Sequence, residues 1–312
     1  MPDVAMPSFE LSGIEFLLAL IRGMFAAGVL SSFGATLFVS VLMLPVTQRL
    51  EPSTAWLIER RCRMVTWGSL IAAAMAGLLW LVLEAGFIAD AETAGQAVAA
   101  VPSVLLDTRF GQVLAIQAFA LLGASAAMAT RRRAGPLAAA CFAGVATLLE
   151  AGHSHAFAMA HGLSALLLSQ VLHLLAAGAW LGGLLPVLLV VREAPLDVAM
   201  LAARRFSTLG LASVAILAAT AMLQGWVLSG GLLGLVGTAY GAVLLVKATL
   251  FAVLIAIAAF NRLRLTPALA APNGEQNRVA LIRSTAAETI IGLCVVLAAG
   301  MLSSLEPGMH QV

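Results

Sequence analysis

Four of the five histidines of the chain lie within one stretch of 21 residues, from His153 to His173. Its first part reads GHSHAFAMAH and places His153 and His155 two residues apart, so an extended backbone turns both side chains to the same side. Met159 follows His155 by four residues, which is about one helical turn. Imidazole and thioether groups together suit copper, and methionine sulfur favours Cu(I) over Cu(II).

The sequence therefore predicts a copper-capturing surface, to which a histidine near the end of the chain also contributes. The residues expected to bind the metal there are His153, His155, Met159, His161 and His310. An alternative interpretation is a polar loop in which these histidines cap helices. The three cysteines are far apart and form no CxxC pair, which argues against a disulfide framework and against a thiolate metal site.

His173 differs from the other histidines because it lies inside a long apolar run, roughly 15 Å from the start of a helix at 1.5 Å per residue. Gln170 and Trp180 lie three residues before it and seven after it, on the same helical face. Gly178 and Gly182 would let another helix approach closely. Ionisable groups inside a bilayer usually mark function, so we expect His173 to receive the metal. A neutral histidine bonded to a neighbouring helix is the structural alternative.

Two further charges lie inside apolar runs. Lys247, the only lysine, either extends its amine to the membrane surface or pairs with an acid. The candidate acids are Glu15, Glu84 and Glu150. Glu288, in the last run, either neutralises the Asn261-Arg262 segment or carries a proton. We expect structural pairing for these charges rather than direct transport chemistry.

The composition indicates which elements must position these groups. Of 312 residues, 62% are hydrophobic and 10% charged, far from a soluble domain. A helix needs about 20 apolar residues to cross a bilayer. Eight runs satisfy this, near 14–44, 64–88, 110–130, 136–157, 163–191, 206–229, 239–261 and 281–304. The expected fold is an all-α bundle of about eight transmembrane helices in a single membrane domain over residues 1–312; whether the fourth run spans fully is left open.

Basic residues set the expected orientation, because arginine-rich loops stay in the cytoplasm. Fourteen of the 17 lysines and arginines fall in the odd-numbered connections, which places both termini on the extracytoplasmic side. The net charge of +2 is too small to indicate nucleic-acid binding. The longest connection holds only some two dozen residues, so we expect no large extramembrane domain and no enzyme activity.

The second half of the chain resembles a known family. The pattern H-x6-WLGG begins at His173, T-x-YG-x5-K ends at Lys247, an NR pair at Asn261 precedes a proline, and Glu288 lies in the last run. In combination these resemble the CopD (copper resistance protein D) family, most strongly over residues 163–310. The family positions matched are His173, Trp180, Tyr240, Lys247, Asn261, Arg262, Glu288 and His310.

The resemblance implies copper transport across the bacterial inner membrane, as Cu(I) or Cu(II), with a separate periplasmic CopC-like protein as partner. Import from the periplasm fits such a partner better than export. Two alternatives remain open. One is a haem-binding redox protein like cytochrome b561, although only His173 is deep enough to be a confident iron ligand. The other is a copper-delivery subunit that assembles an oxidase without transporting the metal.

Overall fold

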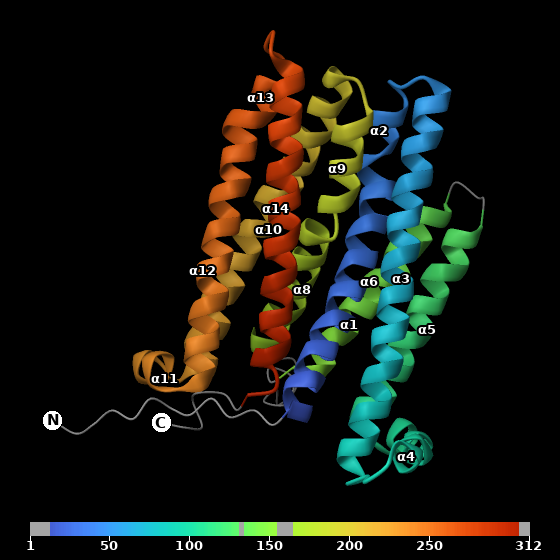
Figure 1. Cartoon of the computed structure of the whole chain (residues 1–312), viewed down its shortest axis with the longest axis vertical. Helices are drawn as coiled ribbons and strands as arrows, with labels where there is room; N and C mark the ends of the chain where they lie inside the picture. Colours follow the sequence, from blue (N-terminus) through green and yellow to red (C-terminus); the bar gives the residue numbers. More distant parts are fainter. Residues whose placement is uncertain (1–12, 131–133, 155–164, 306–312) are drawn as a thin grey trace, which may run out of the picture.

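The computed structural model describes residues 13–130, 134–154 and 165–305, and in this part of the chain every regular element is a helix. The long helices run side by side in one bundle (Figure 1). Eight spans are long and apolar enough to cross a membrane, which confirms the expected polytopic all-α fold. The fourth, Gly135–His153, is among them with 19 residues.

Several spans continue through short irregular turns or are made of two helices. In chain order they are α1 (Gly13–Leu37) with the π-helical η1 (Phe38–Leu42), α3 (Pro52–Ile88), α5 (Arg109–Ala129), α6 (Gly135–Leu149) with the 3-10 turn η2 (Glu150–His153), α8 (Ala165–Leu181) with α9 (Leu184–Glu193), α10 (Leu196–Ser229), α12 (Ala239–Phe260) with the π-helical η3 (Asn261–Leu265) and α13 (Thr266–Ala268), and α14 (Gly274–Leu302). Short helices lie outside the spans, namely α2 (Leu44–Thr47), α4 (Ala94–Asp107) and α11 (Leu232–Gly237).

Helix α1 is the centre of the bundle. It packs against α3, α6, α8 and α14. On one side, its apolar residues join a core with those of α3, α5 and α6. On the other side, they join a second core built from α8, α9, α10 and α14. The two halves of the chain therefore meet mainly along α1, with further contacts of α3 with α9 and of α6 with α8.

The contact between α1 and α8 depends on glycine. A Cβ atom at Gly182 would clash with the carbonyl oxygen of Leu30 and lie 2.9 Å from the Cα of Gly34. A Cβ at Gly34 would lie 2.5 Å from the Cα of Gly182, and one at Gly178 would lie 2.8 Å from the ring of Phe33. The expectation that Gly178 and Gly182 admit a neighbouring backbone is confirmed.

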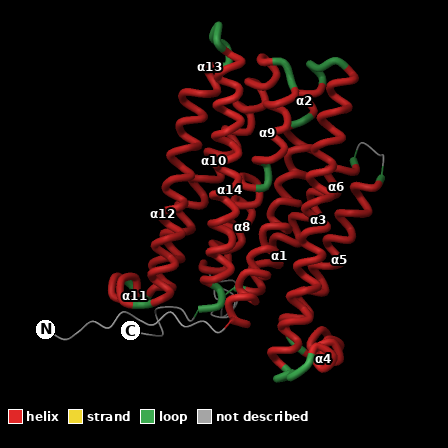
Figure 2. Tube along the Cα trace, viewed as in Figure 1, coloured by secondary structure: helices red, strands yellow, loops and turns green. Residues whose placement is uncertain are grey.

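The fifth span is interrupted, which its apolar sequence did not indicate. Gly182 and Gly183 form a turn between α8 and α9, visible as a loop at mid-height of the bundle (Figure 2). The Gly183 amide bonds to Trp180 rather than four residues back, and Pro186 has no amide hydrogen to donate to the turn before it. The break therefore lies just beyond Trp180.

At one end of the bundle the helices extend past their apolar runs. The first residues of α3, α10 and α14 are Pro52, Leu196 and Gly274, well before the runs expected from 64, 206 and 281. Arginine and glutamate favour helix as well as leucine does, so helices continue beyond the hydrocarbon where hydropathy falls. We call this the arginine-rich end, after Arg49, Arg60, Arg61, Arg63, Arg192, Arg204, Arg205, Arg262, Arg264, Arg278 and Arg283.

The opposite end holds the start of α1, the end of α14 and two short helices, α4 and α11 (Figure 1). The connection between the second and third spans was expected as a loop, but contains α4. Thr93 and Gln96 form a capping box at its start, with the Gln96 amide donating to Thr93 Oγ1 at 3.3 Å. Valine and leucine side chains leave α4 and α11 with exposed apolar surface.

We predict that Gly182→Ala destabilises the protein by about 1–3 kcal/mol, because the added methyl group overpacks the α1 contact. Gly68→Ala is the matched control, since a Cβ at Gly68, within α3, meets no atom within 4 Å. That change should be neutral or slightly stabilising, because alanine favours helix. Thermal unfolding in detergent, followed by circular dichroism, measures both; equal midpoints would contradict the packing account.

Candidate functional site

Most of the expected site residues that the structure describes line one cavity of about 540 Å³. It lies among α1, η2, α8, α10, α12 and α14, in the half of the bundle nearer the opposite end. We call it the histidine cavity. Its polar and charged lining residues include Arg22, Glu150, His153, Gln170, His173, Gln224, Tyr240 and Lys247. Arg22, Glu150 and His153 come from the first half of the chain, and the others come from the second half.

His173 on α8 is held by Thr220 of α10. Its Nδ1 lies 2.8 Å from the Thr220 hydroxyl oxygen. That hydroxyl donates its own hydrogen to the Ile216 carbonyl at 2.7 Å, so it accepts from the imidazole. The hydrogen-bond network thus assigns the proton to Nδ1 and leaves Nε2 with a free lone pair. A neutral imidazole in this tautomer is the form that binds metals.

His153 in η2 is held in the same way by Gln117 of α5. The Gln117 amide nitrogen donates to Glu150 Oε2 at 2.8 Å and to the Ala146 carbonyl at 3.1 Å. Its oxygen therefore faces His153 Nε2, at 2.8 Å, and must accept a hydrogen bond from it. The network leaves Nδ1 of His153 as the nitrogen with a free lone pair.

Aromatic rings fix the position of His153. Its ring centroid lies 4.8 Å from that of Trp80 and 5.5 Å from that of Phe110, both in tilted or edge-on arrangements. The Arg22 guanidinium lies 5.4 Å from the Trp80 ring centroid and donates to the His153 carbonyl oxygen and, at 3.4 Å, to that of Ser303. His153 is thus packed into the bundle rather than exposed in a loop.

Sequence reasoning missed Trp80, Phe110 and Gln117. Gln117 is fully buried and lies in the middle of the third span. A polar side chain inside an apolar run is itself a signal of function or of a bonded network, and could have identified it. Nothing in the sequence pairs Trp80 or Phe110 with His153, because their contact arises between three separate segments.

Lys247 lines the histidine cavity but has none of the expected acidic partners. Among the described residues it forms no ion pair and no hydrogen bond. Glu84 accepts from the Trp80 indole nitrogen at 3.1 Å, and Glu150 accepts from Gln117. The lysine amine therefore has no carboxylate partner among the described residues.

Trp180 separates the histidine cavity from a second cavity of about 320 Å³. It is 2% exposed and is the one residue that lines both spaces. Its ring also packs edge-on against Phe251, with centroids 6.4 Å apart. As expected, Gln170, His173 and Trp180 share a face, since all three line the histidine cavity.

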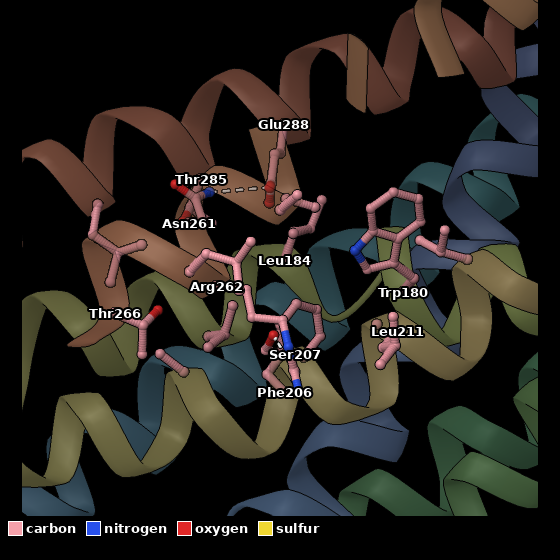
Figure 3. A pocket seen from close by; sticks show the side chains of 18 of the residues that line it. Trp180, Leu184, Phe206, Ser207, Leu211, Asn261, Arg262, Thr266, Thr285 and Glu288 are labelled. Carbon is pink, nitrogen blue, oxygen red and sulfur yellow. Dashed lines mark hydrogen bonds between the residues drawn. The ribbon is translucent and has the colours of Figure 1, made fainter. Parts of the chain in front are cut away.

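The second cavity, which we call the glutamate cavity, lies toward the arginine-rich end between α9, α10, η3 and α14. Figure 3 shows the side chains of Glu288 and Asn261 pointing toward one another, with Trp180 at another part of the cavity lining. The Asn261 amide donates to Glu288 Oε1 at 3.0 Å. Glu288 thus contacts Asn261 of the expected segment but does not pair with Arg262, which donates to the Ser207 hydroxyl at 2.8 Å.

The structure does not bring the expected capture residues together. His155, Met159, His161 and His310 lie outside the described residues. Within the described part of the chain, no three histidine, cysteine or acidic side chains form a metal-binding group. The cysteines are free, with Cys62 buried and the other two exposed. Of the expected metal ligands, His153 and His173 are described by the structure, and both line the histidine cavity.

Models of known protein families match both halves of the chain. A family model described as copper resistance protein D matches residues 200–302, and one for the N-terminal domain of copper resistance protein D-like proteins matches residues 13–166. No solved structure matches the chain.

Two curated relatives align with this chain. Copper transport protein CutJ of Bacillus subtilis (strain 168) is 29% identical over 266 residues, which cover 80% of this chain and 46% of that protein. Inner membrane protein YebZ of Escherichia coli (strain K12) is 32% identical over 167 residues, 51% of this chain and 56% of that protein. The chain thus spans about half the length of these relatives.

We predict that Gln117→Leu lowers the free energy of unfolding by about 1–3 kcal/mol, because it leaves buried polar groups on Glu150 and His153 without a partner. The control is Gln112→Leu, on the same helix, whose exposed amide donates to the Leu106 carbonyl. It should cost no more than about 1 kcal/mol. Denaturant unfolding in detergent compares the two; the network has no stabilising effect if both variants match the wild type.

Proposed function

Because the chain belongs to the CopD family of copper resistance membrane proteins, we propose that it carries copper ions across the membrane through the histidine cavity. The multi-pass helical bundle provides the setting for such a path. No residue in this proposal acts as a catalyst. The substrate is the ion itself, bound and released without chemical change.

One observation carries the proposal: two imidazoles from different parts of the chain line a single cavity. Each uses one nitrogen to bond a neighbouring helix, and the other nitrogen keeps its lone pair. Neutral imidazole nitrogens bind copper in either oxidation state. Met222 also lines the cavity, and because it is 77% exposed it places a thioether at the cavity rim.

The charges around the cavity favour passage over permanent binding. Arg22 carries a positive charge, Lys247 adds another whenever its amine is protonated, and Glu150 is the acid among the lining residues, so a copper ion meets electrostatic repulsion as well as nitrogen ligands. Conduction requires binding strong enough for entry and weak enough for release. The positive charge of a protonated Lys247 would weaken copper binding and so favour release.

The proposed orientation rests on the arginine-rich end. Basic segments stay in the cytoplasm, which supports placing that end inside and the histidine cavity toward the periplasm of an inner membrane. Import is then the natural direction: His155, Met159, His161 and His310 would capture copper at the surface and pass it to His153 and His173. A separate CopC-like protein is the proposed donor.

A haem-binding redox protein is the second candidate. The pair of imidazoles that line one cavity also favours it, because a bis-histidine haem needs two such ligands. The copper-related family weighs against it.

We predict that His173→Ala reduces cellular copper accumulation to the level of cells without the protein, because it removes a nitrogen ligand from the middle of the path. Leu168→Ala, on the same helix and 55% exposed, is the control for side-chain truncation and should leave accumulation unchanged. Cellular copper is measured by elemental analysis and membrane abundance by immunoblot. Full accumulation in His173→Ala at normal abundance would remove His173 from the path.

A further inference from the structure

The glutamate cavity contains a buried acid without a counter-charge. Glu288 is 4% exposed, and the one hydrogen bond that it accepts from the described residues comes from the neutral amide of Asn261. The ion pairs found among the described residues join other side chains. An isolated carboxylate in a low-dielectric interior costs several kcal/mol unless a cation or a proton compensates it.

Asn261, which bonds Glu288, also has a buried polar atom without a partner. Its Oδ1 is buried and accepts no hydrogen bond. Buried acceptors are nearly always satisfied, so an orphan needs an explanation. Asn261 also begins the π-helical segment η3, and such segments often occur at functional sites. Among the described residues, Asn261 Oδ1 therefore has no donor, and it lies on the residue that bonds Glu288.

The other groups around Glu288 do not neutralise it. Arg262 of η3 is the other charged residue that lines the cavity, and it donates to the hydroxyl of Ser207 on α10. Helix α9 contributes apolar side chains, including Leu184 and Val187. On α14 itself, Thr285 is the neutral polar neighbour one turn away. Among the described residues, the one cation that lines this cavity therefore bonds Ser207 and leaves Glu288 without an ion pair.

The chemistry of the acceptors indicates which cation. Carboxylate and amide oxygens are hard ligands and do not suit Cu(I), in contrast to the nitrogens of the histidine cavity. The walls of the glutamate cavity are mostly apolar, which disfavours a hydrated metal ion. A proton needs no further ligands, since it bonds covalently to one carboxylate oxygen.

We propose that Glu288 and Asn261 form a proton-binding site, in which Glu288 carries an exchangeable proton on Oε2 while Oε1 accepts the hydrogen bond from Asn261. Water at the arginine-rich end supplies the proton and takes it back. Because Trp180 lines both cavities, this site lies directly beyond the histidine cavity and could couple proton movement to the passage of another ion. The site itself does not depend on copper.

Infrared difference spectroscopy of the full chain in detergent, without copper, tests the site as the pH is varied. Wild-type protein should show a carbonyl band of a protonated carboxyl group that disappears as the pH rises. Glu288→Gln should lose this band. Glu275→Gln, an exposed acid on the same helix that bonds Arg278, should retain it. Glu150→Gln, which alters the histidine cavity, should also retain it.

A second variant keeps the proposal testable if Glu288→Gln does not fold. Asn261→Leu removes the hydrogen bond to Oε1, so the carbonyl band should move to higher frequency. Identical spectra for wild type and Glu288→Gln, or an unshifted band in Asn261→Leu, would overturn the proposal. So would a band that disappears with added sodium at constant pH, since that indicates an alkali-ion site.

Discussion

The close contact of α1 with α8 is the constraint on which the rest of the structure depends. Lipid tails are as apolar as leucine, so helices in a membrane gain little from hydrophobic burial and associate through close packing of small residues. Gly34 and Gly182 bring the two backbones together. The same contact places α8, with His173 and Trp180, against the helix that carries Arg22. Without it, neither the histidine cavity nor its separation from the glutamate cavity would have a fixed geometry.

Neutral hydrogen bonds, rather than ion pairs, organise the buried polar groups. Thr220 holds His173, Gln117 holds His153, and Asn261 holds Glu288. A neutral partner avoids the desolvation cost of a buried ion pair. Some polar groups remain without a hydrogen-bond partner among the described residues: one nitrogen on each histidine, the Lys247 amine and the Asn261 oxygen. Those unused groups line the two cavities or border them, which is where an ion in transit would need them.

The sequence was sufficient for the number of spans, the face shared by Gln170, His173 and Trp180, and the glycines that admit α1. Each of these follows from hydropathy or helical spacing within one segment. The break after Trp180, the short helix α4 and the enclosure of His153 by Trp80 and Phe110 could not be obtained in this way. The enclosure of His153 depends on contacts between segments far apart in the chain. The break and α4 have local signals that hydropathy does not capture, namely Gly182-Gly183 with Pro186, and Thr93 with Gln96. Lys247 is the clearest case, because the sequence offered three acids and the structure pairs it with none.

The most direct test of the central claim is the metal content and X-ray absorption spectrum of the purified protein after exposure to copper and desalting. The account predicts retained copper with imidazole nitrogen among its ligands. It also predicts less retained copper and a weaker imidazole nitrogen signal in the double variant His153→Ala, His173→Ala. An unchanged copper spectrum in that variant would contradict the histidine cavity as the site. Stoichiometric iron with little copper would contradict copper as the substrate and favour haem.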